Sequence, residues 1–378
     1  MIHRIYNIRE MGRSIFMNLQ NDQQIYLNAG TTNNFELVRT LNRGDIIRIT
    51  SYEDFITRTG EPTWRIFDFE LITRCPHNLP LVVSNDEATF GQVGTDIQRR
   101  NRVLNWIVNP TSLNVVRERS RIVRTLRNYL ESNDAIEVET PILQPQYGGA
   151  SARPFITNHN TLDRNFYLRI SPELYLKRLI VGGLPFVYEI SRCFRNEGID
   201  RNHNPEFTLL EFYRLDSDWT WGIEFTERIV SEILNITTPF RRINFIDSLR
   251  EIGIDINGLT VEQLDDLFSE RIEPSLTEPT FVCGHPSEMS PLAFSVDGIA
   301  ERFELYINGM EIANGYTEQN DAVVQRQMME RMNNVDEDYL QALSYGMPQT
   351  CGVGIGIDRL IMLALNYRNI SDVITFPC

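Results

Sequence analysis

One stretch of the chain, FVYEISRCFRNEGIDRNHNPEFTLLEFY at residues 186–213, decides how the rest is interpreted. Residues 186–193 and 207–213 alternate in the manner of β-strands, and the loop between them is rich in Gly, Asp, Asn and Pro, a turn composition. We therefore predict an antiparallel hairpin. Strand alternation then places Phe207, Leu209, Glu211 and Tyr213 on one face.

The same face carries groups of three chemical kinds. On the partner strand, alternation groups Glu189 and Cys193 with Arg195, whose planar fork suits a phosphate or a carboxylate. Phe207 offers a flat ring, and Glu211 with Tyr213 could hold a cation. The combination indicates a ligand site. The alternative interpretation is a half-exposed hairpin with surface ion pairs.

Three segments of this stretch, FRNEG (194–198), HNPEF (203–207) and EFY (211–213), resemble a known motif. It is the second signature motif of class II aminoacyl-tRNA synthetases, in the form typical of lysyl-tRNA synthetases. The resemblance extends over nearly the whole chain. It implies an α+β protein with a five-stranded OB-fold barrel at residues 1–80, a linker at 81–116 and a catalytic domain at 117–378. That domain is an antiparallel sheet flanked by helices, with a short helical insertion at about 214–280.

Composition agrees with a multidomain globular protein of 378 residues, 42% hydrophobic and 23% charged. No run of about 18 apolar residues exists, so we expect no membrane span. The five scattered cysteines form no CxxC pair, which argues against a zinc site and for reduced thiols in the cytoplasm. The net charge of −15 argues against strong general affinity for nucleic acid.

Lysine is almost absent. Lys177 is the only lysine, and the other basic residues are arginine. Average usage would give roughly twenty lysines in a chain of this length. Asparagine and isoleucine are abundant, which argues against GC-rich coding as the cause. Selection or engineering against lysine would both produce this pattern.

Residues 1–80 contain short strands at 15–19, 24–27, 45–50 and 65–72 and a possible helix at 34–41. This pattern suits a five-stranded OB barrel, although a generic small β-domain also fits. The segments IREMGRSIF, RGDIIRI and TRTGEPTW resemble the anticodon-binding barrel of bacterial-type lysyl-tRNA synthetases. The resemblance implies that the residues that read the anticodon of tRNA-Lys are Arg9, Phe16, Tyr26 and Glu70. Tyr26 stands where the family has Gln.

DIQRRNRVLNWIVNP (residues 96–110) resembles the family's linker to the catalytic domain, although a plain spacer also fits. A helix is predicted at 117–133, with an apolar stripe that includes Ile122, Leu126 and Leu130. A strand and Pro141 follow. This order resembles the first class II motif and implies a homodimer interface, whereas the pattern alone predicts only an amphipathic core helix.

Residues 170–183 read as a helix that ends at two glycines. The glycine pair at 148–149 permits a close backbone approach to a ligand, or forms a plain turn. By resemblance, Glu173 contacts the lysine α-ammonium, where the pattern alone predicts an ordinary first-turn Glu. The complete lysine site that the resemblance implies is Gly148, Glu173, Arg195, Glu211, Tyr213, Asn314, Tyr316 and Glu318.

RFELYINGMEIANGYTE (302–318) contains Asn308-Gly309 between apolar runs, which predicts a two-residue type I′ hairpin. This turn pairs Tyr306 with Glu311 and makes Glu304 and Glu311 diagonal neighbours. Two such carboxylates repel unless a cation lies between them, and Mg²⁺ suits carboxylate plus phosphate oxygens. The family uses this pair for its ATP-bound magnesium. Asn314 joins the same face only if a bulge lies near Gly315.

GVGIGIDRLIML (352–363) has glycine at alternate strand positions, which leaves a bare strip for a flat ligand. We expect Asp358 to cap the following helix and Arg359 to lie in its first turn. The segment resembles the third class II motif, whose Arg contacts the ATP γ-phosphate. The implied catalytic residues are Arg195 and Arg359. The implied ATP site is Arg195, Glu197, His203, Asn204, Phe207, Glu304, Glu311, Gly356 and Arg359.

The resemblance implies a cytoplasmic lysine–tRNA ligase that takes ATP, L-lysine and tRNA-Lys, with Mg²⁺. Two alternatives stay open. One is a lysine-activating relative that acylates a protein such as elongation factor P, against which the N-terminal barrel argues. The other is a binding protein without catalysis, against which the retained motif residues argue. His285, in HPSEMSPLA (285–293), is expected to be structural, since no second metal ligand lies at the required spacing.

Overall fold

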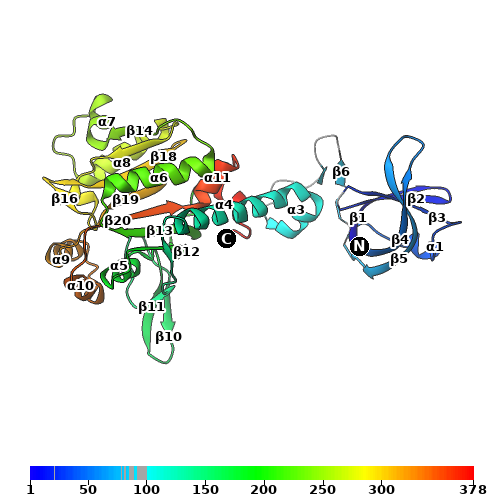
Figure 1. The fold of residues 1–378 in the computed structure, drawn as a ribbon, viewed down its shortest axis with the longest axis horizontal. Coiled ribbons are helices and arrows are strands. Elements are labelled where there is room, and N and C mark those ends of the chain that lie inside the picture. The colour runs from blue at the N-terminus through cyan, green and yellow to red at the C-terminus, as the bar shows by residue number, and fades with distance from the viewer. Residues whose placement is uncertain (21, 78, 81, 85–88, 92–99) are drawn as a thin grey trace. The chain divides into compact units, whose positions relative to one another are not determined.

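A computed structural model describes residues 1–378 except 21, 78, 81, 85–88 and 92–99. The chain divides into two compact units, Met1–Glu118 and Arg119–Cys378, called unit 1 and unit 2 below (Figure 1). No helix among the described residues is long and apolar enough to cross a membrane. Part of the predicted linker, including Arg99, falls outside the described residues.

Unit 1 is built around a five-stranded sheet that closes into a barrel in the order β1-β2-β3-β5-β4. Its neighbours are antiparallel except β3 and β5, which run parallel. Alternate side chains such as Ile15, Met17 and Leu19 are buried inside the barrel. The elements are β1 Ile2–Met11, β2 Ser14–Leu19, β3 Gln24–Asn28, α1 Phe35–Val38, β4 Ile46–Ile56, β5 Pro62–Thr73, β6 Val82–Ser84, β7 Thr89–Gly91 and α3 Arg102–Val108.

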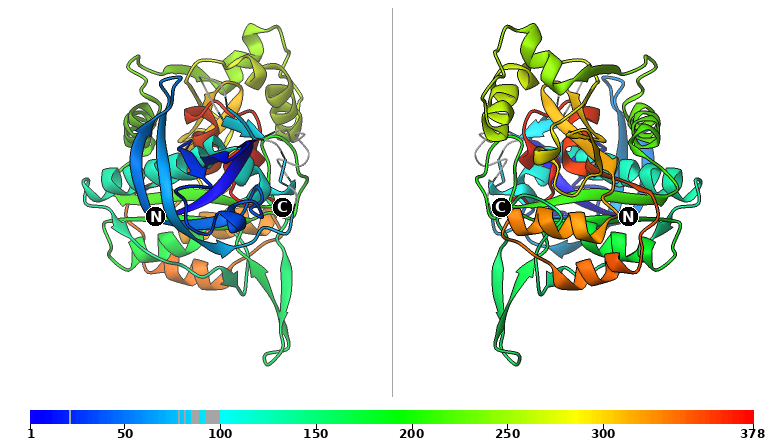
Figure 2. Two further views of the ribbon diagram at one scale, coloured as in Figure 1. Left: turned by 90° about the vertical axis from the view of Figure 1, so that its right-hand side faces the viewer. Right: turned by 90° about the vertical axis from the view of Figure 1, so that its left-hand side faces the viewer.

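Unit 2 is α+β, with an eight-stranded sheet in the order β14-β15-β18-β19-β20-β13-β12-β8. It contains α4 Asn114–Glu131, which begins before the unit boundary, β8 Ile136–Glu137, β9 Leu143–Gln144, β10 Ile156–His159, β11 Arg164–Leu168, α5 Glu173–Val181, β12 Phe186–Phe194, β13 Glu206–Leu215, α6 Trp219–Leu234, β14 Arg241–Asn244, α7 Phe245–Glu251, α8 Val261–Arg271, β15 Thr280–Cys283, β16 Ser295–Val296, β17 Ile299–Ala300, β18 Arg302–Ile307, β19 Met310–Thr317, α9 Ala322–Arg331, α10 Glu337–Ser344, β20 Thr350–Gly356, α11 Ile357–Ala364 and α12 Ile370–Val373. The β10–β11 hairpin projects from the rest of the unit (Figure 2).

The two predicted hairpins are present. β12 and β13 pair antiparallel, with Glu189 opposite Glu211. β18 and β19 are joined by Asn308 and Gly309, both at positive φ as a type I′ turn requires. The predicted stripe of α4 is also correct, since Ile122, Leu126 and Leu130 are fully buried.

A bulge in β19 lies earlier than predicted. Leu305 pairs with Ala313 and Tyr306 pairs with Glu311, so the extra residue is Ile312 rather than one near Gly315. The bulge reverses the alternation once, and Glu304, Glu311 and Asn314 consequently share a face. The opposite face of the sheet packs against α6, where Gly222 lies close to Phe303 and Cys351.

Asp358 does not cap α11. The residue at the N-cap is Gly356, which has no side chain to cap with. Asp358 is buried and accepts hydrogen bonds from the Thr208 backbone N–H (2.7 Å) and from Arg119 Nη1 (2.5 Å). Arg119 also donates to Thr208 Oγ1 at 2.8 Å. The carboxylate therefore ties α4, β13 and α11 together.

Replacing Asp358 by Ala is expected to lower the free energy of unfolding by about 3 kcal/mol, because Arg119 and the Thr208 N–H lose a buried partner. Urea unfolding followed by fluorescence measures the change. Asp247→Ala is the matched control, since its ion pair with Arg250 is exposed at both ends and is worth less than about 1 kcal/mol. Equal losses in both variants would refute this account of the junction.

Candidate active site

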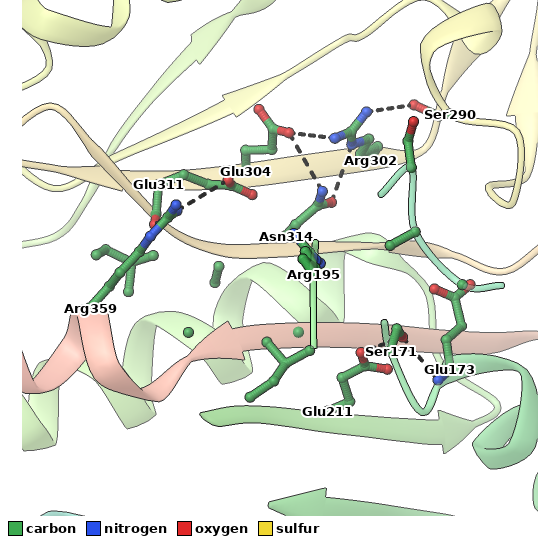
Figure 3. Close-up of a pocket in the computed structure, with 18 of the residues that line it drawn as sticks. Ser171, Glu173, Arg195, Glu211, Ser290, Arg302, Glu304, Glu311, Asn314 and Arg359 are labelled. Carbon is green, nitrogen blue, oxygen red and sulfur yellow. Dashed lines mark hydrogen bonds and ion pairs between the residues drawn. The ribbon is translucent and has the colours of Figure 1, made fainter. Parts of the chain in front are cut away.

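A cavity of about 760 Å³ lies in unit 2, bordered by β13, β18, β19, β20 and α8 (Figure 3). It brings together side chains from segments as distant in sequence as Ser171 and Arg359. Most of the predicted ATP, lysine and metal residues line it. They are Glu173, Arg195, Glu197, His203, Asn204, Phe207, Glu211, Tyr213, Glu304, Glu311, Asn314, Tyr316, Gly356 and Arg359.

Two predicted residues do not line the cavity. A Cβ on Gly148 would lie 2.6 Å from Leu174 Cδ1, so this glycine packs against α5. The next residue, Gly149, lines the cavity at φ +86, and its own Cβ would lie 2.9 Å from Glu173 Cβ. Gly149 is thus the glycine that lets the chain approach Glu173. Glu318 is the second residue outside the cavity. It lies behind Gly352 and forms an ion pair with Lys177.

One side of the cavity is acidic. The Glu211 carboxylate accepts hydrogen bonds from Ser171 Oγ at 2.7 Å and Tyr213 Oη at 2.9 Å. Glu173 accepts one from Tyr316 Oη at 2.8 Å. Figure 3 shows Ser171, Glu173 and Glu211 grouped together at this side. Ser171 had no sequence signal, because a lone Ser before a helix has many structural uses.

Burial makes these charges costly. Burial and the nearby Glu173 carboxylate raise the pKa of Glu211 to about 8. Burial also raises the pKa of Glu318, although Lys177 acts in the opposite direction. For Lys177 burial opposes the charge, but Glu173 and Glu318 outweigh it and the pKa of the ammonium is raised. The acidic side therefore favours protonation of Glu211 and Glu318 until a further cation is bound.

The glycines of β20 serve two purposes. A Cβ on Gly352 would lie 2.1 Å from Glu318 Oε1 and 2.3 Å from Tyr213 Cε1, so this glycine makes room for two protein side chains. Cβ atoms on Gly354 and Gly356 would make only ordinary contacts of 3.7 Å with protein atoms. Both line the cavity, and the bare strip predicted for a flat ligand is therefore confined to these two residues.

Arg195 supplies a cation between the two sides of the cavity (Figure 3). Its Cζ lies 5.1 Å from the centre of the Phe207 ring. Its Nε is buried without a hydrogen-bond partner among the described residues. A buried guanidinium nitrogen without a partner is costly, and an anionic group in the cavity would satisfy it.

The other side holds Glu304 and Glu311 (Figure 3). Burial opposes the charge of Glu304, but Arg302 and His285 outweigh it and lower its pKa. Burial and the Glu304 carboxylate raise the pKa of Glu311. One member of the pair is thus held ionised, and the other would gain from a nearby cation.

Arg359 reaches this carboxylate pair from α11. Its Nη1 donates to the Glu311 carbonyl at 2.8 Å, and its Nη2 lies 2.9 Å from His203 Nε2. His203 Nδ1 in turn lies 2.8 Å from Asp200 Oδ2. The predicted phosphate-binding residues of two distant motifs are therefore in contact.

Arg302 was missed by sequence reasoning. It contacts Glu304 and donates from Nε to Asn314 Oδ1 at 3.2 Å and from Nη1 to Ser290 Oγ at 3.0 Å. The sequence did indicate its location, because Arg302 stands two residues before Glu304 in a strand and alternation places both side chains on one face.

The insertion also contributes, although no chemistry was predicted for it. Asp265 of α8 and Glu273 line the cavity. Burial and Glu311 raise the pKa of Glu273 to about 7. The sequence of an amphipathic helix does not indicate which face of a sheet the helix covers. The location of these two residues in the cavity could therefore not be predicted.

The barrel holds three of the four predicted anticodon residues in one row. Arg9 pairs with Phe16, and Phe16 pairs with Tyr26. The Phe16 and Tyr26 rings lie 5.0 Å apart, and Phe55 stacks on Tyr26 at 5.5 Å. Arg65, opposite Tyr26, covers the Phe55 ring at 4.4 Å.

Glu70 lies outside this row. It forms an exposed ion pair with Arg48 at 2.7 Å. Along β5 it is about 17 Å from Arg65, at some 3.3 Å per strand residue. The structure therefore does not bring Glu70 beside the other three.

Comparison with known proteins agrees with this geometry. The sequence profile described as tRNA synthetases class II (D, K and N) matches residues 94–378. The chain belongs to this family. A curated relative, the lysine–tRNA ligase of Syntrophomonas wolfei subsp. wolfei (strain DSM 2245B / Goettingen), is 39% identical over 99% of this chain and 86% of its own length. The lysine–tRNA ligase of Thermoanaerobacter pseudethanolicus (strain ATCC 33223 / 39E) is 37% identical over 99% and 85%.

The acidic side predicts a pH dependence of stability. Glu211 has a pKa of about 8 in the folded protein and near 4.5 as its ordinary value. The folded state therefore binds more protons between these pH values, and its free energy of unfolding falls as pH rises, by up to about 1.4 kcal/mol per pH unit. Urea unfolding between pH 5.5 and 7.5 should show a shallower fall in Glu211→Gln. Identical slopes would contradict the assignment.

Proposed function

We propose that this protein is a lysine–tRNA ligase. It activates L-lysine with ATP to lysyl-adenylate and pyrophosphate, and then transfers lysine to the 3′ end of tRNA-Lys. The observation that carries the proposal is a single cavity with an acidic side, a central arginine without a salt bridge to the described residues, and a carboxylate pair beside Arg359. Family membership and the curated relatives support the same activity.

Each part of the substrates has a counterpart in the cavity. The two ammonium groups of lysine suit the acidic side, with Glu173 taking the α-ammonium and with Glu211 and Tyr213 beside the ε-ammonium, while the charge of Glu318 acts on it from behind Gly352. Glu318 Oε1 has no hydrogen-bond partner among the described residues and lies against the bare Cα of Gly352. A neutral amino acid would leave these carboxylates unpaired at a cost of several kcal/mol, which favours its rejection.

ATP would lie across the sheet, with its adenine between Phe207 and Arg359. Arg195 would hold the α-phosphate, and His203 with Arg359 the terminal phosphates. The predicted contacts from Glu197, Asn204 and Gly356 belong to the same proposal, as does an amino-acid contact from Asn314 and Tyr316. The backbone at Gly149 takes the place proposed for Gly148.

The first step joins the two substrates. The lysine carboxylate attacks the α-phosphorus, an oxygen–phosphorus bond forms, and the bond to the bridging oxygen breaks to release pyrophosphate. No protein nucleophile is required. Arg195 orients both reactants and stabilises the charge on the phosphate oxygens, so positioning and electrostatics supply most of the rate enhancement.

Glu304 and Glu311 are the residues that would hold Mg²⁺ with the ATP phosphates. The fit rests on the carboxylate pair, in which Glu304 raises the pKa of Glu311. No cluster of three metal-binding side chains exists among the described residues. Phosphate oxygens and water would complete the shell, as is usual for Mg²⁺. An ion held there by Glu304 and Glu311 would neutralise phosphate charge.

The two domains and their partners follow from this activity. The strand order β1-β2-β3-β5-β4 supports an OB fold for residues 1–80. Its row of Arg9, Phe16 and Tyr26 would contact anticodon bases by stacking and charge. Glu70, outside that row, remains a prediction from the family. We assign residues 81–116 to a linker and 117–378 to the catalytic domain.

A homodimer is part of the proposal. The sheet ends at β8, and Ile136, Ile142 and Leu143 beside it are each more than 40% exposed. Such an apolar edge after α4 suits an interface with a second copy.

We also place the protein in the cytoplasm, where tRNA is charged.

Lysine-dependent ATP–pyrophosphate exchange, followed by charging of tRNA-Lys, tests the function. We expect both, and we expect Arg195→Ala to reduce exchange at least 100-fold because the transition-state charge loses its main protein partner. Exchange without charging would favour a protein-acylating enzyme. Absence of exchange with lysine would refute the proposed function, and full exchange by Arg195→Ala would refute the role of Arg195.

Two alanine substitutions in one strand separate the two substrate sites. Gly352→Ala should raise KM for lysine at least tenfold, because its Cβ collides with Glu318 and Tyr213. Gly354→Ala meets no protein atom closer than 3.7 Å and should raise KM for ATP instead, since its methyl group enters the flat ligand's space. Exchange kinetics measure both constants. An unchanged KM for lysine in Gly352→Ala would contradict the layout.

A further inference from the structure

The single lysine of the chain lies directly behind the acidic side of the cavity. Lys177 is fully buried. Its Nζ lies 2.6 Å from Glu173 Oε1, forms an ion pair with Glu318, and lies 5.5 Å from the centre of the Tyr316 ring. The mechanism above gives Lys177 no contact with substrate, and it does not line the cavity.

The net charge of the buried groups around the Lys177 ammonium indicates a role for it. Glu173, Glu211 and Glu318 are each 4% exposed or less. Together with Lys177 they carry two net negative charges when all are ionised. Lysine carries two ammonium groups, and its carboxylate has Arg195 as a partner. The buried charges of the acidic side therefore balance when a diamino acid is bound, and burying unbalanced charge is expensive.

We propose that Lys177 is a positioning and specificity-determining residue of the amino-acid site. It anchors the carboxylates of Glu173 and Glu318 through its two ion pairs, and it sets the net charge of the site at the value that two ammonium groups neutralise. This inference rests on the proposed function. Without Lys177 the buried carboxylates would lose an ion-pair partner, burial would favour their protonated form further, and a protonated carboxyl no longer favours an ammonium.

The geometry also accounts for lysine at this one position in a chain that otherwise uses arginine. The ammonium is a compact charge that donates in three directions, toward Glu173 and Glu318 from one point. A guanidinium is larger and planar. In a site with no exposed surface it would displace one of the two carboxylates, because packed interiors have no spare volume.

The test is Lys177→Met in the full-length protein, which keeps the length of the side chain and removes its charge. In lysine-dependent exchange we expect KM for lysine to rise at least tenfold, with KM for ATP changed less than threefold. KM for lysine should also fall more steeply with rising pH than in the wild type, because the unpaired carboxylates must lose a proton to bind. A KM for lysine within twofold of wild type would overturn the proposal.

Arg178→Met is the matched control. Arg178 is the next residue of α5 and pairs with Asp336 away from the cavity. The substitution should leave KM for lysine within twofold of wild type. A rise equal to that of Lys177→Met would show a general effect of disturbing α5 and would overturn the proposal.

A second variant keeps the test decisive if Lys177→Met does not fold. Lys177→Met/Glu318→Gln removes one charge of each sign, leaves the cavity-lining Glu173 and Glu211 in place, and restores two net negative charges. We expect it to fold, judged by its melting temperature, and to bind lysine at least threefold more tightly than Lys177→Met, or, without that reference, to show measurable lysine-dependent exchange. A folded double variant without this gain would overturn the charge balance. Wild-type protein without lysine-dependent exchange would instead refute the proposed function.

Discussion

The constraint on which this structure depends is the burial of carboxylates that cannot all pair with one another. Glu173, Glu211 and Glu318 come from α5, β13 and the residue after β19, and only one ammonium, that of Lys177, reaches them. Ser171, Tyr213 and Tyr316 supply neutral donors around the remaining oxygens. Such an arrangement is costly when empty, and under the proposed function this cost favours a doubly cationic substrate.

The opposite side of the cavity uses the same physics with a different balance. Arg302 and His285 keep Glu304 ionised, while Glu311 is left with Arg359 as its nearest cation. The bulge at Ile312 adds an amide to this side, because it brings Asn314 to the face that already carries Glu304 and Glu311. One extra residue in β19 thus decides whether the carboxylate pair and the amide meet in one cavity.

Asp358 links these sites to the scaffold. Its carboxylate joins Arg119 of α4 to the Thr208 backbone of β13, and the next residue is Arg359. The positions of three sequence motifs are consequently coupled through one buried acid. Its expected role as a helix cap was wrong because the cap position fell on Gly356, and the side chain instead found stronger partners from distant elements.

Local pattern determined the hairpin strands, the type I′ turn and the buried stripe of α4, because alternation and turn chemistry act over a few residues. The resemblance of the sequence motifs to those of a known family, rather than local pattern, implied most members of the site. Tertiary structure alone decided that Gly149 rather than Gly148 meets Glu173, that Asp265 and Glu273 of the insertion enter the cavity, and that Lys177 stands behind Glu318. These facts depend on contacts between segments far apart in the chain, and no short-range pattern records the volume or charge that a distant segment brings.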